Sequence, residues 1–364
     1  MRSLDDSTDV TRLFAPTQLG HLELRNSFVM APMTRSRSPQ STPTAEVAEY
    51  YRRRAAGGVA LLITEGVLVD HISAGHHDDV PRLDPRTAVA WNAVVDAVHR
   101  EGSRMFAQLW HLGGERHDVG CTTAWTPSGV PGTGSPCPHT MSVHDIDAVV
   151  ESFGRTAAQA RARGFDGVEI HSAHGYLIDE FLWPETNRRT DGYGGSIANR
   201  VRFATEIVSA VRAATTPDYP ISIRFSQFKE RCFAAHIAES PRELEAILVP
   251  LMDAGATLFH ASQRRFWEPA FEGSDLNLAG WAKKVTGLPA ITVGSVGLQA
   301  GELRGCSHPE HSLAALAQRH AAGEFDLVAV GRPLLANPSF VNDVADERFD
   351  EMCDYRKDDE LVWP

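Results

Sequence analysis

The stretch Gly167-Val-Glu-Ile-His-Ser-Ala-His-Gly-Tyr176 decides how this chain is interpreted. It opens with the short apolar run of a buried strand and continues at once into His171, His174 and Tyr176. An imidazole N–H can hold a carbonyl oxygen on which negative charge develops, and a phenol can deliver a proton. Packing does not explain two imidazoles and a phenol at this spacing, so we expect a functional site where the strand ends. No third ligand lies at a suitable spacing for a metal, and we expect none.

Similar short apolar runs recur along the chain and alternate with segments of helical period. The strands that we expect are residues 28–33, 60–65, 105–111, 167–171, 221–225, 257–261, 290–294 and 327–331. The helices that we expect are residues 45–56, 86–100, 146–163, 198–214, 242–254, 276–285, 313–321 and 340–346. Strands separated by helices favour parallel βαβ units, and eight such units predict a closed (β/α)8 TIM barrel of the α/β class. An open Rossmann sheet is disfavoured because no G-x-G-x-x-G motif follows the first strand.

No repeat or linker divides the 364 residues, so we expect one barrel domain over residues 1–364. The segment 113–139 is rich in Gly, Pro, Ser and Thr. It predicts a loop excursion at the C-terminal face of the barrel, where such loops act as lids or binding elements, although disorder is the alternative.

Charge and cysteine content restrict the partners and the compartment. The chain has 35 Lys and Arg against 47 Asp and Glu, a net charge of −12, which disfavours nucleic acids and anionic membranes as partners. Its five cysteines form no C-x-x-C pair, so zinc and iron–sulfur sites lack their usual spacing. The N-terminus has no apolar signal region, and we expect a soluble cytoplasmic protein whose association into homo-oligomers is left open.

A barrel carries its active site at the C-terminal ends of its strands. The polar and glycine residues expected there are Thr34, Gly66, Gln108, Trp110, His111, His171, His174, Tyr176, Arg224, Gly294, Ser295, Gly331 and Arg332.

Two subsets of these residues indicate a bound group. Gly294-Ser-Val-Gly297 and Gly331-Arg332 follow the last two strands, where barrels commonly bind phosphate through backbone N–H groups and an arginine. Gln108 and Arg224 suit the edge of a heteroaromatic ring that becomes anionic on reduction, such as a flavin. The alternative for Arg224 is an ion pair with the buried carboxylate of Glu169 on the neighbouring strand.

The chain as a whole resembles the old yellow enzyme family of FMN-dependent ene-reductases. The motifs that carry this resemblance, in family order over nearly the whole chain, are Leu13-Phe-Ala-Pro-Thr-Gln-Leu-Gly20, Val29-Met-Ala-Pro-Met-Thr-Arg-Ser-Arg37, Glu49-Tyr-Tyr-Arg-Arg-Arg-Ala55, Ile63-Thr-Glu-Gly66, Gln108-Leu-Trp-His111, the segment 171–200 and Gly331-Arg-Pro-Leu-Leu-Ala-Asn-Pro338. The resemblance implies non-covalent FMN, NADH or NADPH as hydride donor, and an electron-poor alkene as the second substrate in ping-pong order.

The resemblance also implies a role for each site residue. Thr34 would hydrogen-bond the flavin near C4, Pro32 and Gly66 would line the ring, and Gln108 and Arg224 would hold its pyrimidine edge. Gly294, Ser295, Gly331 and Arg332 would bind the phosphate. His171 and His174 would grip the carbonyl or nitro oxygen, Tyr176 would protonate the α-carbon, and Trp110 would form an aromatic wall.

Three segments depart from the family pattern. The first is Gly113-Gly-Glu-Arg116, which follows Leu112 where many relatives have Gly-Arg directly, so Arg116 is assigned no role. The other two are Phe225-Ser-Gln-Phe-Lys-Glu-Arg231, which overlaps the loop 226–236, and Gln263-Arg-Arg-Phe-Trp-Glu-Pro269. These loops predict an unusual substrate preference, with Phe266 and Trp267 either capping the pocket or packing within their loop. Two other functions stay open on the residues alone, a flavin-free barrel lyase or aldolase and a catalytically weak flavin-binding sensor or redox store. No lysine stands at an expected strand end, which disfavours Schiff-base chemistry.

Overall fold

The computed structural model describes residues 10–75, 77–115, 124–130, 138–303 and 311–363. Within these ranges, eight parallel strands close into a barrel, as expected from the sequence. Around the barrel the strands are β3 (Phe28–Met30), β4 (Leu61–Leu68), β5 (Arg104–Trp110), β8 (Gly167–His174), β9 (Ile221–Lys229), β10 (Leu258–Ser262), β11 (Ala290–Val293) and β12 (Leu327–Val330). Each expected strand is confirmed, although β4, β8 and β9 extend three or four residues further than expected.

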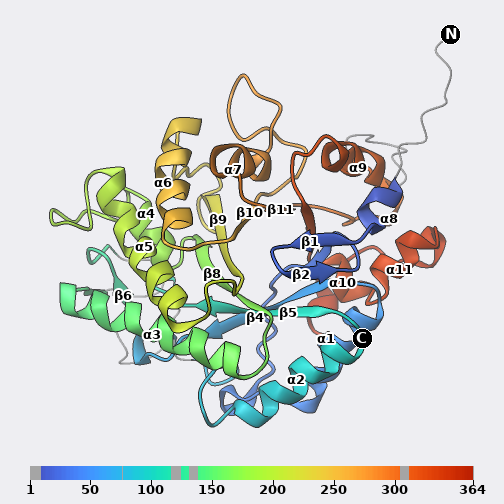
Figure 1. The fold of residues 1–364 in the computed structure, drawn as a ribbon, viewed down its shortest axis with the longest axis horizontal. Helices are drawn as coiled ribbons and strands as arrows, with labels where there is room; N and C mark the ends of the chain where they lie inside the picture. Colours follow the sequence, from blue (N-terminus) through green and yellow to red (C-terminus); the bar gives the residue numbers. More distant parts are fainter. Residues whose placement is uncertain (1–9, 76, 116–123, 131–137, 304–310, 364) are drawn as a thin grey trace.

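The helices form an outer layer around these strands (Figure 1). The eight expected helices correspond to α1 (Ala45–Ala56), α2 (Ala88–Arg100), α3 (Val143–Ala162), α5 (Ile197–Ala214), α6 (Pro241–Asp253), α7 (Leu278–Thr286), α9 (Leu313–Ala321) and α11 (Phe340–Ala345). The short helices α4 (Leu177–Leu182), α8 (Ala300–Leu303) and α10 (Pro333–Ala336) were not expected. Each is too short for an apolar period to identify it.

Local capping explains where the helices begin. Ser240 caps α6 through its side chain, and Pro241 occupies the first helical position, as the sequence predicts. Helix α2 begins at Ala88, two residues later than expected. The carboxylate of Asp84 accepts hydrogen bonds from the backbone N–H groups of Arg86 and Thr87, which holds these residues in a turn ahead of the helix.

An N-terminal hairpin closes one end of the barrel. Strands β1 (Thr17–Leu19) and β2 (Leu22–Leu24) are antiparallel and turn at Gly20, whose φ of 59° favours glycine. The leucines of the hairpin pack against Leu61, Leu258 and Leu327, the first residues of three barrel strands. The N-terminal end of the barrel is therefore filled, and the opposite end is left for a site.

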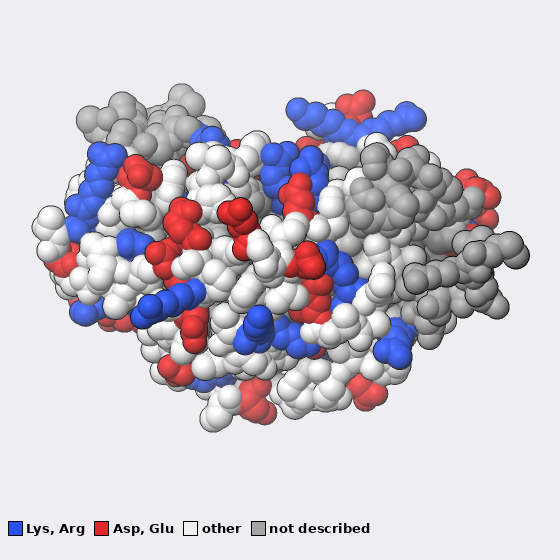
Figure 2. Space-filling view, turned by 90° about the horizontal axis from the view of Figure 1, so that it is seen from above, with Lys and Arg blue, Asp and Glu red and all other residues white. Residues whose placement is uncertain are grey.

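The loop excursion contains β6 (Trp125–Thr126) and β7 (His139–Thr140), which pair with each other. Residues 116–123 and 131–137 of this loop lie outside the described residues, and so do Cys121, Cys137 and Cys306. Cys232 and Cys353 are free thiols. Among the described helices, none combines the length and apolar character that crossing a membrane requires. On the face shown in Figure 2, basic and acidic side chains are interspersed.

Candidate active site

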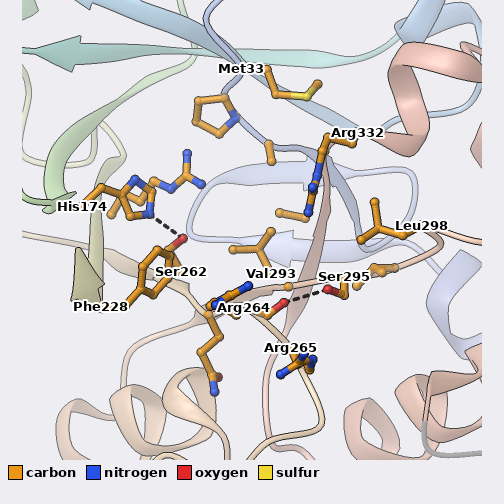
Figure 3. Close-up of a pocket in the computed structure, with 18 of the residues that line it drawn as sticks. Met33, His174, Phe228, Ser262, Arg264, Arg265, Val293, Ser295, Leu298 and Arg332 are labelled. Carbon is orange, nitrogen blue, oxygen red and sulfur yellow. Dashed lines mark hydrogen bonds between the residues drawn. The ribbon is translucent and has the colours of Figure 1, made fainter. Parts of the chain in front are cut away.

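Two adjoining cavities open at the C-terminal ends of the strands. The smaller, of about 190 Å³, is lined by Pro32, Thr34, Gln108, Trp110, His171, His174, Tyr176, Arg224 and Glu230. The larger, of about 410 Å³, includes Gly294, Ser295, Gly331 and Arg332 in its lining and shares Pro32, His174, Arg224 and Glu230 with the smaller one. Figure 3 shows His174 and Phe228 at one end of the larger cavity and Ser295, Leu298 and Arg332 at the other. Apart from Gly66 and His111, the structure brings all residues expected at the strand ends together; His111 is buried, with its Nε2 2.9 Å from Ser73 Oγ.

Strand register explains this convergence. In the parallel ladders His171 pairs with Arg224, and Gln108 pairs with both Gly66 and Glu169. Residues paired across parallel strands lie at the same height in the barrel, so side chains distant in sequence reach the same mouth.

Buried polar contacts fix the amide of Gln108. Its Nε2 donates to Oε1 of Glu169 at 2.9 Å, while Oε2 of Glu169 accepts from Ser222 Oγ at 3.0 Å and lies 2.8 Å from His260 Nδ1. Burial by itself would raise the pKa of Glu169, but His260 and Arg224 hold this pKa below its ordinary value. Gln108 therefore presents its carbonyl oxygen to the cavity, where it can accept a ring N–H.

Arg224 does not form the ion pair with Glu169 that the sequence left open. Its guanidinium is buried, lines both cavities and makes no hydrogen bond or ion pair with any described residue. A buried charge without a partner is costly, so this guanidinium fits an acceptor that enters from the cavity.

Gly66 lies beneath Trp110. A Cβ atom at Gly66 would come within 2.4 Å of Trp110 Cε3, so the packing of this indole requires glycine there. The indole in turn meets Tyr176 edge-on, with 5.0 Å between ring centroids. Gly66 thus makes room for the indole of Trp110, and neither of the two cavities includes Gly66 in its lining.

The two histidines are neutral. Burial, followed by the nearby charge of Arg224, lowers the pKa of both His171 and His174 well below its ordinary value. The backbone N–H of Ala173 points to Nδ1 of His171 at 3.3 Å, which leaves the proton on Nε2 as a donor. His174 has a φ of 67° at a bulge between β8 and β9, and its Nε2 lies 2.8 Å from Ser262 Oγ (Figure 3).

Tyr176 stands next to this pair and stays protonated. Its ring centroid lies 4.8 Å from that of His171. Burial, with smaller contributions from the carboxylates of Glu230 and Glu115, raises the pKa of Tyr176 to about 12. The phenol is therefore a proton donor at neutral pH.

The far end of the larger cavity suits a phosphate. Gly294 has a φ of 151°, and a Cβ atom there would meet the carbonyl oxygen of Gln263 at 2.7 Å. At Gly331 a Cβ would meet no protein atom closer than 3.7 Å, so glycine there keeps space open in the cavity. Ser295 Oγ donates to the carbonyl of Arg264 at 2.8 Å, so the proton of this hydroxyl is already used. The donors that remain for an anion are the backbone N–H groups of these glycine loops and the Arg332 guanidinium. This end, the acceptor amide of Gln108 and the unpartnered Arg224 together fit FMN.

Glu65 shapes the site, although the sequence analysis did not identify it as a site residue. Glu65 accepts backbone hydrogen bonds from Arg35 and Ser36 at 2.9 and 3.2 Å and so holds the segment that carries Pro32 and Thr34. Its position directly before Gly66 in a motif quoted above was the available signal.

The two aromatic residues proposed as caps pack within their own loop. Phe266 is buried, and Trp267 stacks on His311 with 3.7 Å between ring centroids. Neither lines the two cavities, which favours the loop-packing alternative.

Comparisons with known proteins identify the family of this chain. A family model described as the NADH:flavin oxidoreductase / NADH oxidase family matches residues 12–351. An NADH oxidase of Thermoanaerobacter brockii is 34% identical over 95% of this chain, and the chain spans only 52% of that protein. A 12-oxophytodienoate reductase 1 of Oryza sativa subsp. japonica is 32% identical over 95% of this chain and 90% of its own length.

Among solved structures, morphinone reductase in complex with tetrahydroNAD aligns with a TM-score of 0.79 and 29% identity, covering 96% of this chain and 93% of that one. The family model alone covers most of the chain, and the solved structure shares its fold. The chain therefore belongs to the NADH:flavin oxidoreductase / NADH oxidase family, the FMN-dependent oxidoreductases of the old yellow enzyme type.

Proposed function

We propose that this protein reduces the C=C bond of α,β-unsaturated carbonyl or nitro compounds with hydride taken from NADH or NADPH. The observation that carries the proposal is the convergence of two neutral imidazoles and one protonated phenol on one cavity. The ring centroids of His171 and His174 are 5.3 Å apart, and Tyr176 adjoins them.

FMN, held by Gln108, Arg224 and the glycine loops, would supply hydride transfer from the nicotinamide to the β-carbon of the alkene. His171 would donate from Nε2 to the substrate oxygen. Ser262 can donate to His174 Nε2, which leaves the proton of His174 on Nδ1 as a second donor.

The remaining protein step is protonation. As negative charge develops on the oxygen held by the histidines, Tyr176 would transfer its phenolic proton to the α-carbon. Each well-placed oxyanion donor commonly contributes about 3 kcal/mol, and a positioned acid contributes roughly 10²–10⁴-fold. Because NAD(P)H and the alkene would occupy the same mouth, we propose that they react in ping-pong order.

The test uses the protein saturated with FMN under anaerobic conditions. We expect the yellow absorption band to bleach with NADH or NADPH and to return on addition of 2-cyclohexenone, with one equivalent of cyclohexanone formed. A protein that loses all FMN and its yellow colour on desalting would refute the cofactor site. Bleaching without reoxidation by enones, nitroalkenes or maleimides would instead refute the alkene substrate.

A further inference from the structure

Side chains on the loop 226–236 and on the segment 263–269, both of which include departures from the family pattern, form a ladder of rings leading away from His174. The His174 imidazole lies 5.2 Å from the ring of Phe228, and Phe228 lies 6.0 Å from Phe233. Arg264 then stacks on Phe233, with its Cζ 3.9 Å from the ring centroid. All four residues line the larger cavity, so the ladder runs from the proposed oxygen-binding pair to the mouth.

The outer end of this ladder is exposed to solvent. Phe233 is 55% exposed, which is unusual for a phenylalanine that lines a cavity. Figure 3 shows Arg264 between the end that holds His174 and Phe228 and the end that holds Ser295 and Leu298. A ligand anchored at His174 would therefore pass along Phe228 and Phe233 before it meets the guanidinium.

The guanidinium of Arg264 forms no ion pair: within the described part of the chain no carboxylate lies at ion-pair distance from it, and Glu230 is the carboxylate that lines the same cavity. The adjacent Arg265, in contrast, is paired with Glu268 at 2.8 Å. Stacking on Phe233 restricts the orientation of the guanidinium without neutralising it. The result is an oriented, unpaired cation on the wall of a ligand cavity.

We propose that Arg264 and Phe233 form an anion subsite that recognises a negatively charged group on a ligand bound at the histidine pair. This inference rests on the proposed function and adds the ligand class. The ligand would carry an oxygen acceptor at His171 and His174, an apolar or aromatic body along Phe228, and an anionic end at Arg264. The anion can come from a carboxylate on the alkene or from the extra phosphate of NADPH.

The test compares matched ligands on the FMN-saturated protein and on Arg264→Gln. The first pair is 3-(4-hydroxyphenyl)propanoate and 4-propylphenol, whose binding is read from the long-wavelength charge-transfer band. The second pair is NADPH and NADH, whose Kd values are read from anaerobic stopped-flow reduction. We expect Arg264→Gln to weaken the anionic member of at least one pair about fivefold, the size of a solvent-exposed ion pair, and to leave the neutral phenol and NADH unchanged.

The two arms identify the source of the anion. Loss confined to the propanoate assigns the subsite to a carboxylate substrate, and loss confined to NADPH assigns it to the nicotinamide phosphate. In either case the wild-type preference should decline between 20 and 500 mM salt, because an exposed charge is screened. Arg264→Lys, which keeps the charge but not the planar stacking, should retain part of the preference.

Arg202→Gln is the matched control. Arg202 is also exposed and also lies over an aromatic ring, 5.7 Å from the centroid of Tyr193, but it lines neither cavity of the site. Equal weakening of charged and neutral ligands by Arg264→Gln, or no weakening, would overturn the subsite. So would a loss of FMN affinity alone, because Arg264 would then serve the prosthetic group. Each of these outcomes leaves reoxidation by 2-cyclohexenone intact, which separates them from failure of the proposed function.

Discussion

Gln108 Nε2 and Glu169 Oε1 form a buried hydrogen bond of 2.9 Å between β5 and β8, directly below the mouth of the barrel. Glu169 also acts on Arg224 through its charge, more strongly than Glu230 does, although Glu169 and Arg224 form no hydrogen bond. The same buried carboxylate therefore orients the amide and partly compensates the charge of the guanidinium, both of which are expected at the pyrimidine edge of the flavin.

We expect Glu169→Gln to make the two-electron reduction potential of bound FMN more positive by about 30 mV, which corresponds to ~1.4 kcal/mol. Removing a negative charge leaves Arg224 less compensated, and this favours the anionic reduced flavin. A spectroscopic redox titration measures the shift. Ser222→Ala is the control, because it removes a hydroxyl donor to Glu169 without changing the charge. An unchanged or more negative potential would contradict the electrostatic role of Glu169.

The sequence allowed the barrel and most of the site to be predicted. Apolar runs mark the strands, and the rule that barrel sites lie at strand ends selects residues such as His171 and Arg224. It did not determine whether Arg224 forms an ion pair with Glu169. The partners of Glu169 depend on the register that faces it with Gln108 on one side and Ser222 on the other. Register between strands far apart in sequence is set by the closed barrel as a whole.

The same limit explains why the strand predicted at residues 221–225 is shorter than β9. The segment from Ser226 to Lys229, which is polar apart from Phe228, was expected to be a loop, yet the strand continues through it to Lys229. Ser226 accepts a hydrogen bond from the backbone N–H of His174, and Lys229 pairs with a buried carboxylate on α4. Since α4 is too short to predict, neither the burial of this lysine nor its partner was visible in the sequence.

Tyr176→Phe should slow reoxidation of the reduced protein by 2-cyclohexenone by roughly 10²-fold or more, because the positioned proton donor is lost. Reduction of the flavin by NAD(P)H should stay within a factor of about two, since that half-reaction needs no proton from the phenol. Anaerobic stopped-flow measurement of both half-reactions checks this. Equal slowing of the two would show that Tyr176 shapes the site rather than donates the proton.

Glu65 should make stability depend on pH. Burial raises the pKa of Glu65 to about 7 from its ordinary value of 4.5. The folded protein thus holds this proton more tightly than the unfolded chain, and the resulting stability is present below pH 4.5 and lost as the pH rises through 7. Glu65→Gln cannot ionise, so the free energy of unfolding of the variant minus that of the wild type should rise by about 3 kcal/mol between pH 4.5 and 8.

Urea denaturation at several pH values measures this difference. The exposed Glu272→Gln makes the same charge change and should give a curve parallel to the wild type. If the curves of Glu65→Gln and the wild type also run parallel, the carboxyl has the same pKa in the folded protein and in the unfolded chain. The proposed cost of its burial would then be wrong.

We expect the buried ion pair between Lys229 and Asp179 to stabilise the fold and to hold Tyr176 in position. Lys229 Nζ donates to Asp179 Oδ1 at 2.8 Å with both side chains buried, and Asp179 Oδ2 accepts from the backbone N–H of Gly175 at 2.6 Å. Lys229→Met leaves the carboxylate without its counter-charge, and we expect the free energy of unfolding to fall by about 3–5 kcal/mol.

Adding Asp179→Asn to Lys229→Met should recover part of that loss, because the amide is neutral and still accepts from Gly175. The two substitutions are therefore expected to be non-additive in a double-mutant cycle measured by urea denaturation. The single Lys229→Met variant should also slow enone-driven reoxidation more than NAD(P)H-driven reduction, since only the former depends on Tyr176, which adjoins Gly175. Additive losses of stability, together with equal effects on the two half-reactions, would show that the pair neither compensates a buried charge nor positions the proton donor.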